Sequence, residues 1–199
     1  AHVERILHTL HYAQAQANNH ATTEAAAIYL AGEAFGNKVW LKKGRKLLEA
    51  LARKLILEDG TFSQYSVTYH RMVLDTFSYV VDSNKHYGSK PFSEKFMVAY
   101  GRLFEWMRAM VDPVSYDAVN LGSNDGTLLF KLDDCDYRDF RPSLQLACVL
   151  LNHQRLFVGG AWDSVLDALG LDYAQYPMMI RPPTKSSFSK GGFVRFSSS

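Results

Sequence analysis

Apolar residues recur at intervals of three and four along most of the first 111 positions, and this spacing limits the possible folds. It places the apolar side chains on one face of an α-helix, where they can pack against a neighbouring helix. No repeating strand–helix–strand pattern interrupts it, so a parallel sheet is not expected. The helical segments that we predict lie at about 1–10, 22–35, 39–58, 69–80 and 91–111.

Short helix-breaking sequences separate these segments, which indicates antiparallel helices joined by tight connections. Two further helices are predicted, one at 143–152 that begins after Pro142 and a short one at 162–169. The fold class we predict is all-α, and a ring of helical hairpins is open because such rings repeat geometry and not sequence. The breaks are Gly36-Asn37, Asp59-Gly60 and Asp112-Pro113.

Two stretches depart from the helical pattern. Residues 114–139 contain turn-forming and charged residues of mixed sign, which predicts a long irregular connection, and such connections are often functional. The tail after Pro182-Pro183 alternates like a strand around Gly191-Gly192. A lone strand is not stable in water, so it either packs on the helices or begins a β domain.

Composition excludes several classes of protein. The net charge is only +2 and no run of Lys and Arg suits a nucleic-acid backbone, so we expect no nucleic-acid partner. No apolar run approaches the roughly twenty residues that span a bilayer, so we expect no membrane partner. Cys135 and Cys148 are too few for a disulfide framework, and we predict two buried free thiols.

The Asn18-Asn19-His20 sequence precedes the second predicted helix. An Asn pair there can simply cap the helix. Alternatively, Asn19 and His20 project into a cleft and bind an acidic group, with Glu24 one turn later to orient the imidazole. Glu24 can equally be an ordinary solvated position.

A second polar sequence follows about fifty residues later and contains Tyr69. Tyr69 can be a buried structural residue or can transfer a proton. Because the ordinary pKa of tyrosine is about 10, a tyrosine base needs a nearby cation or strong donors, which His20, His70 or Arg71 would supply. The residues that we expect to contact the substrate are Glu24, Gln64, Tyr65, His70 and Arg71.

Metal and cofactor sites find little support in the sequence. Glu4, His8 and His11 have helical spacing, but three ligands on one helix rarely converge on one ion. The acidic residues 133–139 could bind calcium through oxygen atoms, but they lack EF-hand spacing and favour an ion-paired loop. No phosphate-binding loop, nucleophile elbow or dinucleotide fingerprint is present, and we expect no metal and no cofactor.

Taken together, these sequences resemble the heparinase II/III-like polysaccharide lyases. The resemblance covers roughly residues 15–150 and is specific through its combination of short motifs. The matching stretches are Asn18-Asn19-His20 with Glu24, Asp59-Gly60, Gln64 to Arg71, Gly122 to Gly126 and Asp136 to Pro142.

The resemblance implies an (α/α) toroid followed by an antiparallel β-sandwich. It also implies cleavage of an acidic, uronic-acid-containing polysaccharide by β-elimination. Asn19 and His20 would then neutralise the substrate carboxylate, and Tyr69 would act as general acid and often as base. A further catalytic histidine would come from the β domain, and a periplasmic or secreted location is expected.

The resemblance also divides the chain. Residues 1–181 would form part of the toroid, and residues 182–199 would form a linker and the first strand of a missing β-sandwich, so the chain reads as a fragment. Two alternatives stay open. One is a glycan-binding helical domain without catalysis. The other is a glycoside hydrolase, which needs two carboxylic acids across a cleft. Its candidate acids are Asp75, Glu94, Glu105 and Asp125.

Overall fold

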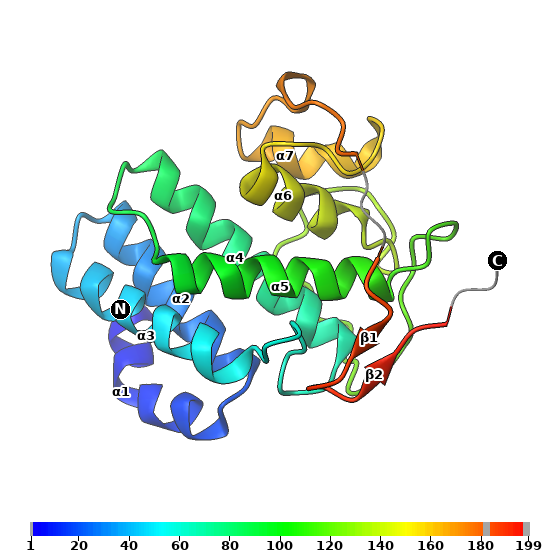
Figure 1. Ribbon diagram of the computed structural model, residues 1–199. Coiled ribbons are helices and arrows are strands. Elements are labelled where there is room, and N and C mark those ends of the chain that lie inside the picture. Colours follow the sequence, from blue (N-terminus) through cyan, green and yellow to red (C-terminus); the bar gives the residue numbers. More distant parts are fainter. Residues whose placement is uncertain (1, 181–183, 197–199) are drawn as a thin grey trace.

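A computed structural model describes residues 2–180 and 184–196, and it is mostly helical, as predicted (Figure 1). The long helices are α1 His2–Gln16, α2 Asn19–Ala34, α3 Lys38–Leu55, α4 Val67–His86, α5 Glu94–Met110 and α6 Arg141–Asn152. The short elements are η1 Ala161–Asp163, α7 Ser164–Ala168, η2 Tyr173–Gln175, β1 Ser187–Phe188 and β2 Phe193–Val194.

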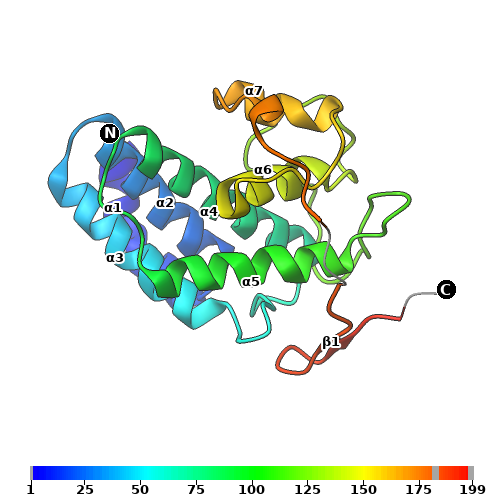
Figure 2. The same ribbon diagram turned by 45° about the horizontal axis from the view of Figure 1, so that its top comes forward.

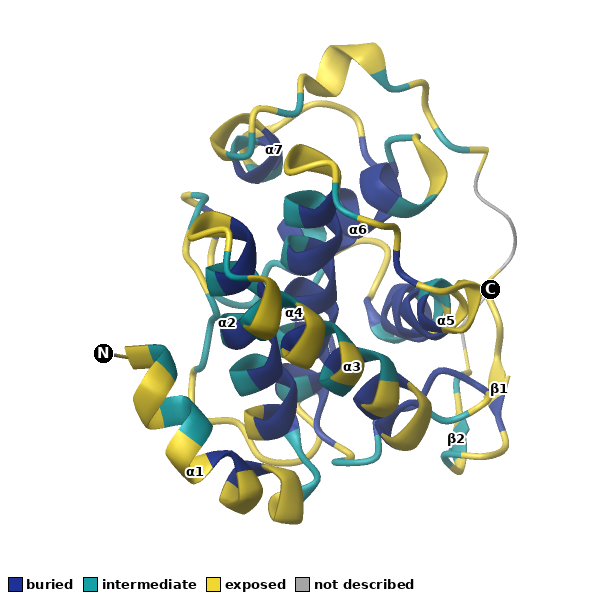
Figure 3. Ribbon diagram, turned by 90° about the vertical axis from the view of Figure 1, so that its left-hand side faces the viewer, coloured by how far each residue is buried: buried dark blue, intermediate teal, exposed yellow. Residues whose placement is uncertain are grey.

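The six long helices form two layers. In the inner layer α2 contacts α4 and α4 contacts α6, while in the outer layer α3 contacts α5. Each connection between α1 and α4 leads from one layer to the other, so α2 and α4 run in the same direction (Figure 3). This alternation is that of a partial (α/α) toroid of antiparallel helical hairpins, and it brings the first residues of α2 and α4 to the same end of the molecule.

Side-chain caps fix where the helices begin. The Oδ1 atom of Asn18 accepts from the His20 amide at 3.0 Å, and Ser66 Oγ accepts from the Tyr69 amide at 3.2 Å. The second helix therefore begins at Asn19, three residues earlier than we predicted from its apolar residues. The third helix ends three residues earlier than predicted, because Ile56 turns into extended backbone and bridges to Phe62.

Two glycines allow α2 and α3 to pack closely. A Cβ atom at Gly32 would overlap the backbone of Leu41, and one at Gly44 would overlap the backbone of Tyr29. The side of α3 that carries Gly44 and Leu48 therefore faces the core, and its other side faces solvent. Helix α4 is covered by both layers and is buried on nearly all sides.

The tail forms a small antiparallel hairpin, in which Ser187 pairs with Val194 and Phe188 with Phe193. Figures 1 and 2 both place it against the end of α5 that carries Trp106. The lone strand that we predicted is thus two short strands joined by a turn, and they pack on the helices. Residues 182 and 183, where the predicted linker begins, lie outside the described residues.

The same structure also places the two cysteines and the irregular connection. Cys135 and Cys148 are buried free thiols, as predicted. Residues 111–140 form the irregular connection that the sequence indicated. Within the described part of the chain, no helix combines the length and the apolar character that crossing a membrane requires.

Candidate active site

The candidate site lies where α2 and α4 begin. The backbone amide of Asn19 donates to Gln64 Oε1 at 3.1 Å, and the Asn19 side-chain amide donates to Met72 Sδ at 3.5 Å. Met72 lies one helical turn after Tyr69 on α4. These contacts join the start of one inner helix to the start of the other and place Asn19 in the neighbourhood of Tyr69.

The irregular connection crosses this end of the molecule and is fixed to the start of α4. The Val67 amide donates to the Leu121 carbonyl at 3.0 Å, and Ser66 Oγ donates to the Ser123 carbonyl at 2.6 Å. Gly122 has a φ of +76°, and a Cβ atom there would overlap the Tyr65 carbonyl oxygen. A glycine is therefore required where the loop approaches the helix.

Asp125, on this loop, is the hydrogen-bond partner of Tyr69. The Tyr69 hydroxyl donates to Asp125 Oδ2 at 2.8 Å, and this bond is the main cause that raises the pKa of Tyr69 above its usual range. Thr127 and then Tyr69 lower the pKa of the Asp125 carboxyl. At neutral pH the pair is therefore a protonated phenol and an ionised carboxylate.

This charge state corrects the prediction that a cation lowers the pKa of Tyr69. Asp125 raises that pKa, and burial prevents His70 from supplying a cation. With its proton held, Tyr69 is suited first to donating it. Acting as a base requires Asp125 to take the phenolic proton.

Tyr137 brings a second phenol to the same loop. Its hydroxyl donates to Asn124 Oδ1 at 2.7 Å and lies 3.4 Å from Thr68 Oγ1, on the residue before Tyr69. We did not single out Asp125 or Tyr137 as lyase residues from the sequence. The available signal was that both lie in stretches that carry the family resemblance.

His20 and Glu24 occupy one side of α2. His20 is exposed, whereas Asn19 is only 4% exposed and its side-chain amide meets a weak sulfur acceptor. Partial burial raises the pKa of Glu24, and the nearby His20 partly offsets that effect. Glu24 Oε2 is buried and has no hydrogen-bond partner among the described residues.

The structure contradicts the prediction that His70 contacts the substrate. His70 is 1% exposed, its Nε2 lies 2.9 Å from the Leu103 carbonyl oxygen, and its ring stacks on Trp106 with centroids 4.3 Å apart. Burial lowers the pKa of His70 to about 4, so the ring is neutral at pH 7. Its role is to pack α4 against α5.

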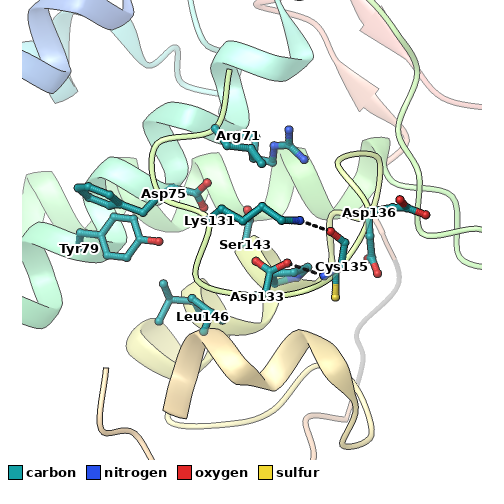
Figure 4. A pocket seen from close by; sticks show the side chains of 14 residues that line it. Arg71, Asp75, Tyr79, Lys131, Asp133, Cys135, Asp136, Ser143 and Leu146 are labelled. Atoms are coloured by element: carbon teal, nitrogen blue, oxygen red, sulfur yellow. Dashed lines mark hydrogen bonds between the residues drawn. The ribbon is translucent and has the colours of Figure 1, made fainter. Parts of the chain in front are cut away.

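Arg71 is also removed from the substrate by burial, which corrects the same prediction. It is 2% exposed, lies between the rings of Tyr137 and Phe140, and donates from Nη1 to the Tyr137 carbonyl at 2.6 Å. Figure 4 shows it at the edge of an internal pocket that also contains Asp75. Arg71 supports the loop that carries the second phenol.

The pocket in Figure 4 is polar and enclosed by α4, α6 and the irregular connection. Burial raises the pKa of Asp75 to about 7. The Nε and Nη2 atoms of Arg71 have no hydrogen-bond partner among the described residues. In the described part of the chain, no three His, Cys, Asp or Glu side chains are placed to hold a metal.

Tyr65 and Gln64 lie at the turn before α4. Tyr65 is 47% exposed, has a φ of +55°, and its ring lies 5.9 Å from that of Phe193 in the tail hairpin. This backbone conformation is costly for a bulky residue. It places the exposed ring of Tyr65 beside the site. Gln64 faces α2 through its bond to Asn19.

A comparison with known families agrees with this geometry. A family model described as Heparinase II/III N-terminus matches residues 3–121, which is more than half of the chain. The chain belongs to the heparinase II/III family. No curated protein and no solved structure matches it. This heparinase II/III family chain is thus related to polysaccharide lyases.

The family match covers only part of the candidate site. Asn19 and Tyr69 lie within the matched residues, whereas Asp125 lies four residues after the last of them. For this heparinase II/III family member, the structure adds the contact between Tyr69 and Asp125 to the residues expected from the sequence. Asn19 contacts Gln64 and also Met72, which lies one turn from Tyr69, whereas His70 and Arg71 turn into the core.

Proposed function

We propose that the full-length protein cleaves a uronic-acid-containing polysaccharide by β-elimination, with the site at the start of α2 and α4. The observation that supports this most is the hydrogen bond between Tyr69 and Asp125, made beside Asn19. Family membership supports the same class of reaction. We further propose a periplasmic or secreted location, where such polymers are accessible.

The first requirement of elimination is to make the proton at C5 of the uronic acid removable. That proton is only weakly acidic, because removing it places negative charge beside a carboxylate. The exposed His20 would bind this carboxylate, joined by Asn19 once its side-chain amide leaves the Met72 sulfur. Together they would neutralise its charge, so that the developing enolate can extend onto it. Preorganised donors of this kind are each worth about 3 kcal/mol of transition-state stabilisation.

Tyr69 would supply the proton transfer. The C5–H and C4–O4 bonds break, a C4–C5 double bond forms, and O4 of the leaving sugar receives a proton. The raised pKa keeps Tyr69 protonated, the form that a general acid toward O4 requires, and the C5 proton would then pass to the catalytic histidine expected from the β domain. When the phenol instead takes the C5 proton, Asp125 would first accept the phenolic proton.

The hydrolase alternative has less support. Asp75 is buried in the pocket under α4, and Glu94 and Glu105 lie on the outer helix α5, where Glu105 pairs with Arg108 at 2.6 Å. Hydrolysis needs two carboxylic acids on either side of one glycosidic bond. Of the four acids considered, Asp125 is the one that lies beside Tyr69.

Replacing Tyr69 with Phe in the full-length protein tests the proposal. The substitution keeps the ring and removes the proton, so the rise in ultraviolet absorbance that accompanies unsaturated uronides should fall at least 100-fold. Tyr87→Phe, at the far end of α4, is the matched control and should retain activity. Unchanged turnover by Tyr69→Phe would remove tyrosine from the mechanism.

A further inference from the structure

Positive charge is concentrated on one outer helix. Helix α3 contains seven basic residues and one acidic residue, which gives it a net charge of +6. The whole chain has a net charge of only +2, so the remainder is −4. A surface that serves only solubility mixes positive and negative side chains, whereas α3 carries almost only positive ones.

Six of the seven cations are exposed and take part in no ion pair with a described residue. Arg45 is the exception, because its guanidinium donates to the Pro91 carbonyl at 2.9 Å and to the Lys90 carbonyl. The six are Lys38, Lys42, Lys43, Lys46, Arg53 and Lys54. Folding therefore does not use these charges.

The charges in the first half of α3 also weaken the helix that carries them. Lys38, Lys42 and Lys46 follow one another at intervals of four, where like charges repel. The first turn of α3 contains no acidic residue, and Lys38 lies at the positive end of the helix dipole. A positive surface that is unfavourable to the helix but points to solvent indicates a binding role.

The exposed side of α3 suits a long, acidic carbohydrate. It faces away from the close packing at Gly32 and Gly44 and is turned toward the viewer in Figure 3. From Lys38 to Lys54 it extends for about 24 Å along the helix axis. At its first end the ring of Phe35 is 77% exposed and Val39 is 73% exposed, which offers an apolar surface for sugar rings.

We propose that this side of α3 is a second, non-catalytic binding surface for an acidic polysaccharide. It would hold part of a polymer outside the site formed by α2 and α4. Charge complementarity supports a polyanion, and membership of a family related to polysaccharide lyases favours a carbohydrate over a nucleic acid. The proposal goes beyond catalysis, because the surface binds whether or not the bound polymer is cleaved.

A triple substitution on α3 of the full-length protein tests this surface. We would compare Lys42→Gln/Lys43→Gln/Lys46→Gln with Lys95→Gln/Arg102→Gln/Lys185→Gln, which removes the same charge from exposed positions elsewhere. Affinity electrophoresis through polygalacturonate, alginate or heparin measures binding. The α3 variant should bind at least one of these probes about tenfold more weakly at low salt, with a smaller dependence on NaCl, as expected when cations are removed from a polyanion site. The control should change less than twofold.

Two results would overturn the proposal. One is equal weakening by both triple variants, which would assign binding to net charge alone. The other is equal loss of affinity for a DNA duplex and for the polysaccharides, which would indicate a general polyanion surface. Thermal melting of both variants shows that each is folded.

Catalysis is measured separately from this binding. With a tetrasaccharide, whose cleavage does not need a second binding surface, the α3 variant should release unsaturated uronide at the wild-type rate. With the polymer its KM should rise while kcat stays the same. Failure of the Tyr69→Phe prediction would leave the electrophoresis result unchanged, so the two proposals fail independently.

Discussion

At the scale of the residue, Tyr69 depends on Asp125 for its charge state. Because the carboxylate raises the pKa of the phenol, Tyr69 keeps its proton to higher pH than an ordinary tyrosine does. A general acid loses function as pH rises through its pKa. In the proposed mechanism, the Asp125 partner would therefore extend the active range toward alkaline pH.

Replacing Asp125 with Asn tests this dependence. The amide removes the negative charge, so the pKa of Tyr69 should fall and the alkaline limb of the pH profile of kcat/KM should move to lower pH. If Asp125 also accepts the phenolic proton, kcat should fall at least tenfold at neutral pH. Asp134→Asn, on an exposed part of the same connection, is the control. If the alkaline limb does not move, Asp125 does not set the pKa of Tyr69.

The sequence can identify Asn19 and Tyr69 but not the orientation of their neighbours. Tyr69 lies on an apolar stripe with Val73 and Phe77, which predicts that one side of α4 faces the core. The structure buries α4 on nearly all sides, so His70 and Arg71 are buried as well. That burial depends on α5 and on the 111–140 connection, which no pattern within α4 reveals.

At the scale of the element, the tail hairpin supports the turn before α4. The Gly191 amide donates to Asp59 Oδ2 at 2.8 Å, and the other carboxylate oxygen of Asp59 accepts from the Thr61 amide at 3.1 Å. Trp106 contacts the rings of Phe188 and Phe193. The hairpin is therefore held to the same segment that leads into the candidate site.

Gly191 is the position where this contact is closest. A Cβ atom there would overlap the side chain of Thr61, which is buried and cannot swing away. We expect Gly191→Ala to lower the free energy of unfolding by about 1–3 kcal/mol, as overpacking does. Urea unfolding measures this, with the exposed Ser189→Ala as the control. Equal stability of the two variants would show that the hairpin packs loosely.

Local sequence predicts some helices and strands more accurately than others. Capping residues such as Ser66 and Ser93 and the breaks between helices give the helical order, because those signals act within a few residues. The start of α2 was predicted three residues too late, although its Asn18 cap is a local signal, and the tail hairpin was predicted as one strand. The hairpin depends on a distant segment, because Gly191 contacts Asp59.

At the scale of the whole molecule, the two layers decide which residues can act together. Because α2 and α4 are both inner helices that run in the same direction, their first residues meet at one end. The outer helix α3 carries its cations on a different side. This arrangement separates the proposed polymer-binding surface on α3 from the proposed reaction site at the start of α2 and α4.

If Asn19 and Tyr69 serve the same transition state, their substitutions should not be additive. Asn19→Ala alone should lower kcat/KM, because one donor to the carboxylate is lost, by roughly 10²-fold. Once Tyr69→Phe has removed the proton transfer, the same change should cost much less, since groups that act as a unit lose their effect together.

The measurement is a double-mutant cycle on the full-length protein, with unsaturated uronide absorbance as the readout. Tyr69→Phe combined with the distant Tyr87→Phe supplies the additive reference. A coupling free energy close to the whole effect of Asn19→Ala would mean that residues from two separate inner helices act on the same sugar. Full additivity would mean that the contact between the starts of α2 and α4 organises the fold without joining Asn19 to the chemistry of Tyr69.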